Sequence, residues 1–211
     1  MRNLRSRKKR VLEVLDKYEN LYSFSNLEEY IVNSNGVLNF IWNNWNNWWR
    51  DYWLSHVNGG YAIDSTKLNK IFQYNDKQSL HYLCHIAGKF KRHNPGDSIV
   101  GTHQELTWGD YDKIEQIALE LYSRHPHLTH LNYLLSLIGS YQTEIKHFQL
   151  IRNSFIHLNN ESVNKLNSIK PYYVFNTDQK LIEILESNHI ISNRKCINHL
   201  VDNMRGLIIN I

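Results

Sequence analysis

One segment of the chain, residues 152–157 with the sequence RNSFIH, carries residue types that can cleave a phosphodiester bond without a metal ion. An arginine can neutralise the charge that builds up on the phosphate, and a histidine can move the proton. Arg152 and His157 lie five positions apart, and the amide of Asn153 stands next to the arginine. These three residues therefore form our predicted catalytic site.

The spacing alone does not identify this pair, because it recurs in the chain. The other pairs of this kind are Arg50 with His56, Arg124 with His130, and Arg194 with His199. Arg152 differs from the other three arginines in its position. It lies in a predicted helix at 131–155, at a place where the 3–4 spacing of apolar residues predicts another apolar residue. A charge there is costly to bury unless it is paired or faces a cleft or interface, which favours a functional role. The Arg194/His199 pair, also on a predicted helix, stays an alternative.

The composition is that of a folded protein with a sizeable core. The chain has 211 residues, of which 42% are hydrophobic and 12% aromatic, and we expect one domain over residues 1–211. The two cysteines, Cys84 and Cys196, argue against a disulfide scaffold and are expected to be buried, reduced thiols. Neither a secretory signal nor an apolar run of membrane-spanning length is visible, so we expect a cytoplasmic protein without membrane contact.

The net charge of +4 is compatible with a nucleic-acid partner. Much of the excess lies in residues 1–10, a basic arm that is either a solvated helix start or a segment that contacts phosphates. A second basic cluster, formed by Lys89, Lys91 and Arg92, either grips a nucleic-acid backbone or solvates its loop. These three residues are our candidates for nucleic-acid binding.

The hydrophobic pattern predicts an all-α protein, a bundle of helices. Expected helices cover 11–21, a segment after 25–26, 37–57, a segment after 64–65, 76–89, 111–123, 131–155, 178–186 after a cap at Thr177, and 194–208. Residues 171–175 are expected to be briefly extended. The stretch 88–109 is expected to be a long loop, and loops of this length inside a domain are often functional.

Tryptophans concentrate in the predicted helix at 37–57. Trp42, Trp45, Trp49 and Trp53 follow the spacing of one helix face. Such a face can stack on unpaired bases, or it can pack in a bundle core or a dimer interface. The pattern favours burial over base stacking.

Residues 147–157, with the sequence HFQLIRNSFIH, resemble the signature of HEPN (higher eukaryotes and prokaryotes nucleotide-binding) domains. The resemblance implies a helical bundle that dimerises through the motif-bearing helix, with two motifs facing each other. It also implies a metal-independent endoribonuclease in which Arg152 contacts the scissile phosphate, Asn153 orients or binds, and His157 acts as general base or acid. Many members act in toxin–antitoxin or anti-phage systems. The expected partners are therefore RNA, a second copy of the chain, and an antitoxin or defence protein.

Metal binding is the remaining chemistry that the sequence suggests. His81, Cys84 and His85 share one helix face, with His93 and His103 in the loop that follows, and Cys196 and His199 form a second pair. Ligands one helical turn apart can hold zinc, but the His-Glu-x-x-His pattern of catalytic zinc is missing. We therefore expect no metal and no other cofactor.

A non-catalytic protein is the alternative to the endoribonuclease. In it the chain is a helical scaffold or an RNA-binding subunit of a bacterial defence complex. Its tryptophan helix is then an assembly surface, and Arg152 forms a buried structural ion pair.

Overall fold

The computed structural model describes residues 2–18, 26–176 and 179–211. The chain divides into two compact units. Unit 1 comprises Met1–Leu12, Asn43–Ser140 and Ile211, and unit 2 comprises Glu13–Trp42 and Tyr141–Asn210. Two helices, α1 (Leu4–Tyr18) and α2 (Leu27–Asn58), contribute residues to both units. Within the described residues, no helix combines the length and hydrophobicity needed to cross a membrane.

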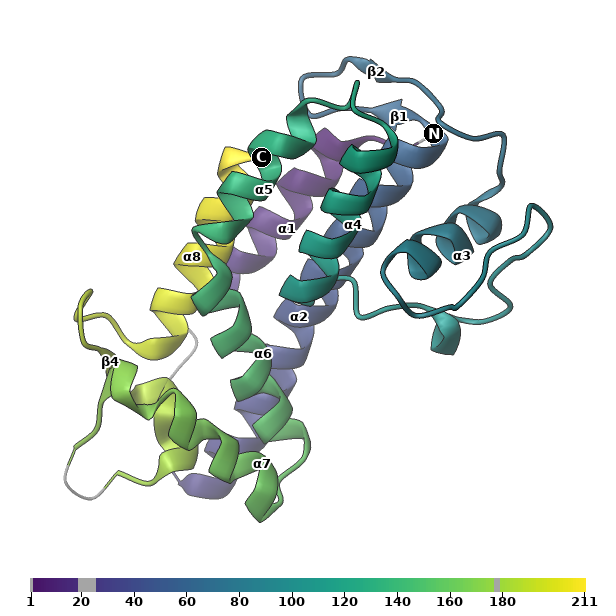
Figure 1. Cartoon of the computed structure of the whole chain (residues 1–211). Coiled ribbons are helices and arrows are strands. Elements are labelled where there is room, and N and C mark those ends of the chain that lie inside the picture. The colour runs from purple at the N-terminus through teal and green to yellow at the C-terminus, as the bar shows by residue number, and fades with distance from the viewer. Residues whose placement is uncertain (1, 19–25, 177–178) are drawn as a thin grey trace. The chain divides into compact units, whose positions relative to one another are not determined.

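Unit 1 is built around the C-terminal half of α2. Its other elements are β1 (Gly60–Tyr61), β2 (Lys67–Leu68), α3 (Asp76–Ile86), η1 (Thr102–Gln104), α4 (Tyr111–Arg124) and α5 (His130–Gly139). β1 and β2 pair antiparallel, and α4 and α5 pack against each other (Figure 1). The long connection from α3 to α4 contains one short 3-10 helix, η1, which agrees with the loop predicted at 88–109.

Tryptophans form the centre of unit 1. Trp45, Trp49 and Trp53 are each 0% exposed, and their rings contact one another in edge-on and stacked arrangements. The indole Nε1 of Trp45 donates a hydrogen bond of 3.0 Å to the carbonyl oxygen of Gly109. Burial as the role of these tryptophans is therefore confirmed, because their faces are covered by protein and cannot stack on bases in this fold.

The contact between Trp45 and Gly109 leads to a prediction about stability. A Cβ at Gly109 would overlap the Trp45 ring, with the indole Nε1 2.7 Å away. We expect Gly109→Ala to lower the free energy of unfolding by about 1–3 kcal/mol, the usual cost of overpacking. Gly96→Ala, in the same loop, is the control because a Cβ there meets nothing within 4 Å. Equal urea midpoints for the two variants would contradict the prediction.

Unit 2 is built around α6 (Gln142–Ile156) and α8 (Cys196–Asn210), which pack together. Its other elements are α7 (Asn160–Lys165), η2 (Leu166–Ser168), η3 (Lys170–Tyr172), β3 (Tyr173–Val174), η4 (Leu181–Glu186) and β4 (Asn188–His189). β3 and β4 pair antiparallel. The N-terminal half of α2 completes the core, where the Trp42 ring stacks on Phe148 at 5.9 Å.

The structure is mostly helical, so the all-α prediction is confirmed, but one predicted helix is wrong. The segment after Asp64 and Ser65 forms the turn and second strand of the β1–β2 hairpin. The Asp64 carboxylate accepts a hydrogen bond of 2.9 Å from the Thr66 amide, and Ser65 has a positive φ of 72°. A short polar side chain that bonds its own backbone in this way stabilises a turn instead of a helix start.

Other element boundaries differ from the predictions. The two helices expected before and after Gly36 form one continuous helix, α2. The single helix expected at 131–155 is two helices, α5 and α6, separated at Ser140 and Tyr141. The α-helix expected at 178–186 is the 3-10 helix η4, and its predicted cap at Thr177 lies outside the described residues. The expectation of one domain over residues 1–211 stays a prediction.

The basic N-terminal arm belongs largely to a helix, since α1 begins at Leu4. Arg7 Nε lies 2.8 Å from an Asp51 carboxylate oxygen, and Arg2 forms ion pairs with Asp51 and Asp76. Two of the arginines are therefore neutralised by carboxylates of unit 1. For Arg2 and Arg7, this arrangement favours the interpretation of the basic segment as a helix start over its interpretation as a phosphate-contacting arm.

Candidate functional site

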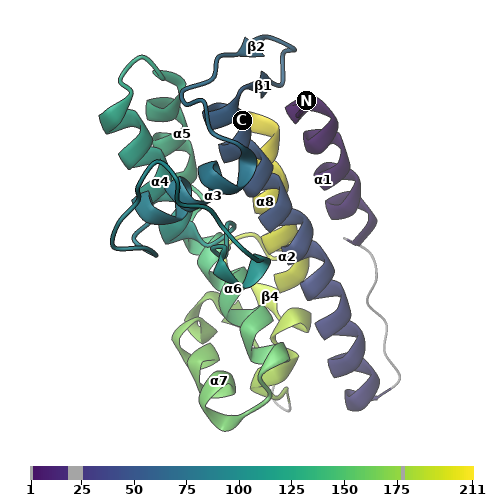
Figure 2. The same ribbon diagram turned by 90° about the vertical axis from the view of Figure 1, so that its right-hand side faces the viewer.

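The end of α6 positions the three predicted catalytic residues. The helix stops at Ile156, and His157 leaves helical geometry with φ −111° and ψ 73°. Asn159 then caps α7 by accepting a hydrogen bond of 2.8 Å from the Ser162 amide. α7 lies beside the C-terminal part of α6 (Figures 1 and 2). An ideal helix would place His157 about 140° round from Arg152, so the end of the helix removes this constraint on the histidine.

Arg152 is half-buried, and side-chain amides hold its guanidinium. Its Nε donates a hydrogen bond of 3.0 Å to Asn39 Oδ1 on α2, and its Nη1 donates one of 3.0 Å to Asn153 Oδ1. Burial lowers the pKa of Arg152 below its ordinary value. The structure thus brings Arg152 and Asn153 together and adds Asn39, which the sequence analysis did not single out.

Arg152 is less deeply buried than its place in the predicted apolar stripe indicates. The buried side chains of α6 include Ile145, Phe148, Ile151 and Phe155, whereas Arg152 lies beside this stripe. α5 and α6 are separated at Ser140 and Tyr141, and within the predicted stripe Tyr141 and Arg152 are the two half-buried positions. Arg152 is therefore a half-buried residue at the edge of the core and does not replace a core residue.

The charge of Arg152 distinguishes it from the arginines of the other three pairs. Those arginines form ion pairs: Arg50 with Glu105 at 2.6 Å, Arg124 with Glu120 at 3.0 Å, and Arg194 with Asp202. Within the described residues, Arg152 has no carboxylate at ion-pair distance, and its hydrogen bonds go to amide oxygens. An amide oxygen fixes a guanidinium without cancelling its charge, so Arg152 keeps its full attraction for a phosphate.

Two histidines of the competing pairs, His56 and His199, are also engaged. His56 is buried, with its Nδ1 2.8 Å from the carbonyl oxygen of Tyr52. His199 Nε2 lies 3.7 Å from Glu144 Oε1. His157 is exposed at the end of α6, where a substrate can reach its ring.

Two buried histidines give an expected pH dependence of stability. Burial lowers the pKa of His56 in unit 1, and of His147 in unit 2, from 6.5 to about 4. The native state therefore binds fewer protons than the unfolded state between these values, and stability is lost as the pH falls from about 6.5 towards 4. We expect His56→Gln to flatten the dependence of the urea midpoint on pH in this window. The exposed His127, as His127→Gln, is the control, and parallel slopes for His56→Gln and wild type would contradict the account.

A histidine cluster in unit 2 was not predicted. His189 and His199 stack with ring centroids 3.7 Å apart, and Ser192 Oγ lies 3.2 Å from Nδ1 of each. His147 Nδ1 lies 3.2 Å from the Tyr173 hydroxyl. One part of this cluster could be recognised in the sequence, because Glu144 and His147 are three positions apart on α6. The position of His189 could not, because it depends on the pairing of β3 with β4, which the sequence does not indicate.

The basic cluster of the loop lies in unit 1. Lys89, Lys91 and Arg92 are exposed, and Lys89 Nζ donates hydrogen bonds to the carbonyl oxygens of His103 and Glu105. These two hydrogen bonds of Lys89 hold the loop in place. Lys91 and Arg92 point their charges to solvent, where a nucleic-acid backbone can reach them.

The predicted metal-ligand face of α3 is only partly realised. Cys84 is buried, its Sγ lies 3.9 Å from the carbonyl oxygen of Gln104, and burial raises its pKa to about 12. Cys84 belongs to the buried face of α3, whereas His81 and His85 are half-buried, so the cysteine and the two histidines lie in different surroundings. Cys196 is also a buried free thiol, whereas His199 is half-buried.

Comparison with known proteins gives no further guide, because no family model, curated protein or solved structure matches the chain.

Proposed function

We propose that the protein is a metal-independent endoribonuclease of HEPN type, with Arg152, Asn153 and His157 as its catalytic residues. The observation that supports this most is the guanidinium of Arg152, held by amides and, within the described residues, not neutralised by a carboxylate. The three competing arginines already bind carboxylates. A fixed, uncancelled positive charge is what stabilisation of a pentavalent phosphate requires.

The chemistry follows from the residues available. His157 takes the proton of an RNA 2′-hydroxyl, whose oxygen forms a bond to the adjacent phosphorus as the bond to the 5′-oxygen breaks. The departing 5′-oxygen takes up a proton, and the other product ends in a 2′,3′-cyclic phosphate. Arg152 balances the charge on the phosphate oxygens, and Asn153 fixes the guanidinium through its Oδ1. Water plays no part in this first step.

A dimer completes the proton transfers. One chain offers one exposed histidine at this site, but attack and departure profit from a base and an acid. We propose that two copies place their motifs opposite each other, so that one His157 accepts the proton and the other donates one. The solution mass of the purified protein tests this part, since a strict monomer is incompatible with it.

The cellular role we propose is that of a cytoplasmic toxin or anti-phage effector controlled by an antitoxin or another defence protein. Lys89, Lys91 and Arg92 are the residues proposed to hold the RNA backbone. Lys91 and Arg92 are exposed, as such contacts require. Substituting them should weaken binding without regard to RNA sequence.

The test is incubation of the purified wild-type protein with single-stranded RNA in the presence of EDTA. We expect cleavage, with 2′,3′-cyclic phosphate ends detected by mass spectrometry. RNA with 2′-O-methyl groups, which has no attacking hydroxyl, should stay intact. An absence of cleavage would favour the non-catalytic scaffold or RNA-binding subunit, and cleavage restored only by Mg²⁺ would exclude the proposed mechanism.

A further inference from the structure

A compact group of side chains of the types that ligate metal ions lies in unit 1, where the loop after α3 returns to that helix. His81 belongs to α3, whereas His93 and Asp97 belong to the loop. One ligand atom from each of the three lies within 4.8 Å of the other two. The Nδ1 atoms of His81 and His93 are 2.9 Å apart.

The loop is fastened to α3 on both sides of these residues. Gln78 Nε2 donates a hydrogen bond of 3.2 Å to the Pro95 carbonyl, and the Ile99 amide donates one of 3.0 Å to the Lys77 carbonyl. The ring of Phe90 stacks on His81 at 4.4 Å. The positions of His93 and Asp97 against the helix are therefore set by several contacts outside the cluster, as a preformed ligand set needs.

Two observations show that the histidines lack ordinary partners. His93 Nε2 is buried and, among the described residues, makes no hydrogen bond. His93 Nδ1 lies against His81 Nδ1. These two nitrogens can form a hydrogen bond only if one of them carries a proton and the other does not. Two nitrogens bound to one tetrahedral zinc ion lie roughly 3.3 Å apart, so a shift of a few tenths of an ångström would admit the ion.

We propose that His81, His93 and Asp97 bind a divalent transition-metal ion, with Zn²⁺ as the expected species, which fastens the loop 87–110 to α3. Two imidazoles and one carboxylate suit zinc and related ions, whereas Mg²⁺ and Ca²⁺ prefer oxygen ligands alone. The role is structural, because a metal that joins a helix to a loop adds its binding free energy to folding.

His85 lies close to these three residues but is not one of the group. It follows His81 by one helical turn, and its ring centroid lies 6.2 Å from that of His93. Its Nδ1 lies 2.8 Å from the carbonyl oxygen of Phe90, and this contact is a further attachment of the loop to α3.

The experiment measures Zn²⁺ bound by untagged, full-length protein, together with the visible absorption of the Co²⁺-loaded form. We expect one equivalent of Zn²⁺, a higher melting temperature with Zn²⁺, and a tetrahedral Co²⁺ spectrum. His81→Ala and His93→Ala should each weaken binding at least about 100-fold, because even the outer partners of metal ligands are worth about 10- to 100-fold. Asp97→Asn keeps the size of the side chain and should also weaken binding.

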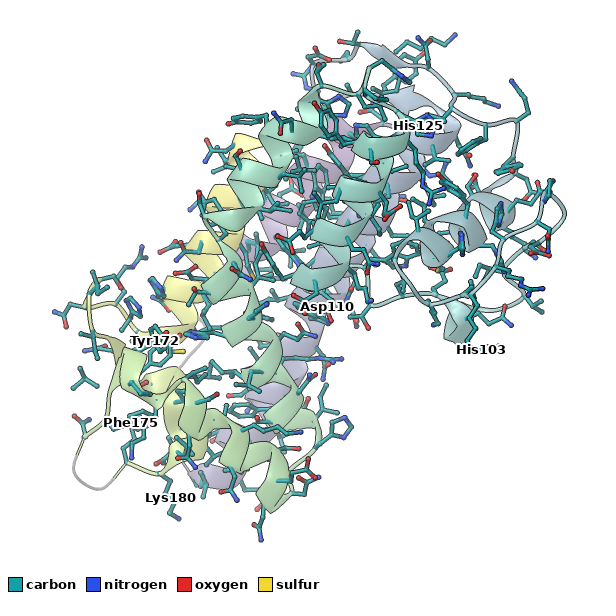
Figure 3. All side chains as sticks on the ribbon, in the orientation of Figure 1. His103, Asp110, His125, Tyr172, Phe175 and Lys180 are labelled. Atoms are coloured by element: carbon teal, nitrogen blue, oxygen red, sulfur yellow. The ribbon has the colours of Figure 1, made fainter. Side chains whose placement is uncertain are left out.

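The control is His103→Ala. His103, labelled in Figure 3, lies on η1 in the same loop and outside the group of three. It should bind Zn²⁺ as the wild type does. Failure of the wild type to bind Zn²⁺, binding unchanged in Asp97→Asn and His93→Ala, or equal binding of Mg²⁺ would each overturn the proposal. None of these readouts depends on RNA cleavage, so they are independent of the proposed nuclease activity.

Discussion

Replacing Arg152 with alanine is expected to lower the rate of RNA cleavage in EDTA by about 10²- to 10³-fold, the usual cost of removing one group that stabilises transition-state charge. The substitution removes the positive charge and leaves the amide oxygens of Asn39 and Asn153 without their donor. The rate of product formation under single-turnover conditions is the measurement. Arg152→Lys should recover part of the rate, since it restores the charge but not the planar guanidinium.

Arg124→Ala is the matched control for this prediction. Arg124 also precedes a histidine at similar spacing, but it is exposed and pairs with Glu120 on the same helix. It should cleave RNA at the wild-type rate, because exposed ion pairs of this kind contribute little to stability. If Arg152→Ala keeps its melting temperature and also cleaves at the wild-type rate, Arg152 is not catalytic. A lowered melting temperature with unchanged cleavage by the folded fraction would favour the structural role.

Replacing Trp49 with alanine is expected to lower the free energy of unfolding by about 3–5 kcal/mol, as for large aromatic residues in other cores. Trp49 is 0% exposed and contacts the rings of Trp45, Tyr52 and Trp53 at centroid distances of 5.6, 5.5 and 5.8 Å. Its removal leaves a cavity that these rigid rings cannot fill by small shifts. Chemical denaturation followed by circular dichroism measures the effect.

Phe40→Ala is the control for the tryptophan. Phe40 lies on the same helix, α2, but it is 44% exposed. Its truncation should cost about 1 kcal/mol or less, because less apolar surface is removed from a buried environment. Equal losses of unfolding free energy for Trp49→Ala and Phe40→Ala would contradict the prediction.

Most of the helical architecture could be predicted from periodicity because it depends on local spacing. The apolar positions of α2, α4 and α8 repeat at helical intervals, and their burial follows. The hairpin at β1–β2 could not be predicted in this way. Its strands have two residues each, too few to show alternation, and its turn depends on a positive φ at Ser65.

The candidate site was predictable only in part. Arg152 and Asn153 are adjacent in sequence, so the motif names them together. Asn39 lies 113 residues before Arg152 and joins it only through packing of α2 against α6. The Arg50/His56 pair looked like the Arg152/His157 pair in sequence because its carboxylate partner, Glu105, comes from elsewhere in the fold, whereas Glu120 lies four residues before Arg124 on the same helix.

The metal ligands illustrate a similar limit. The one-turn spacing of His81 and His85 is local, and both histidines do lie near His93. Cys84, between them, belongs to the buried face of α3, which the helix pattern alone did not separate from the histidine face. Asp97 cannot be recognised from the sequence, since its approach to α3 depends on how the loop folds back.

The most direct test of the central claim compares two single substitutions in unit 2, Arg152→Ala and Arg194→Ala, for RNA cleavage in EDTA at equal folded concentrations. Both arginines precede a histidine by five positions, but among the residues that the structure describes only Arg194 of the two binds a carboxylate, that of Asp202. We expect Arg152→Ala to lose cleavage and Arg194→Ala to retain it. Retention by Arg152→Ala together with loss by Arg194→Ala would contradict this expectation and would move the active site to α8.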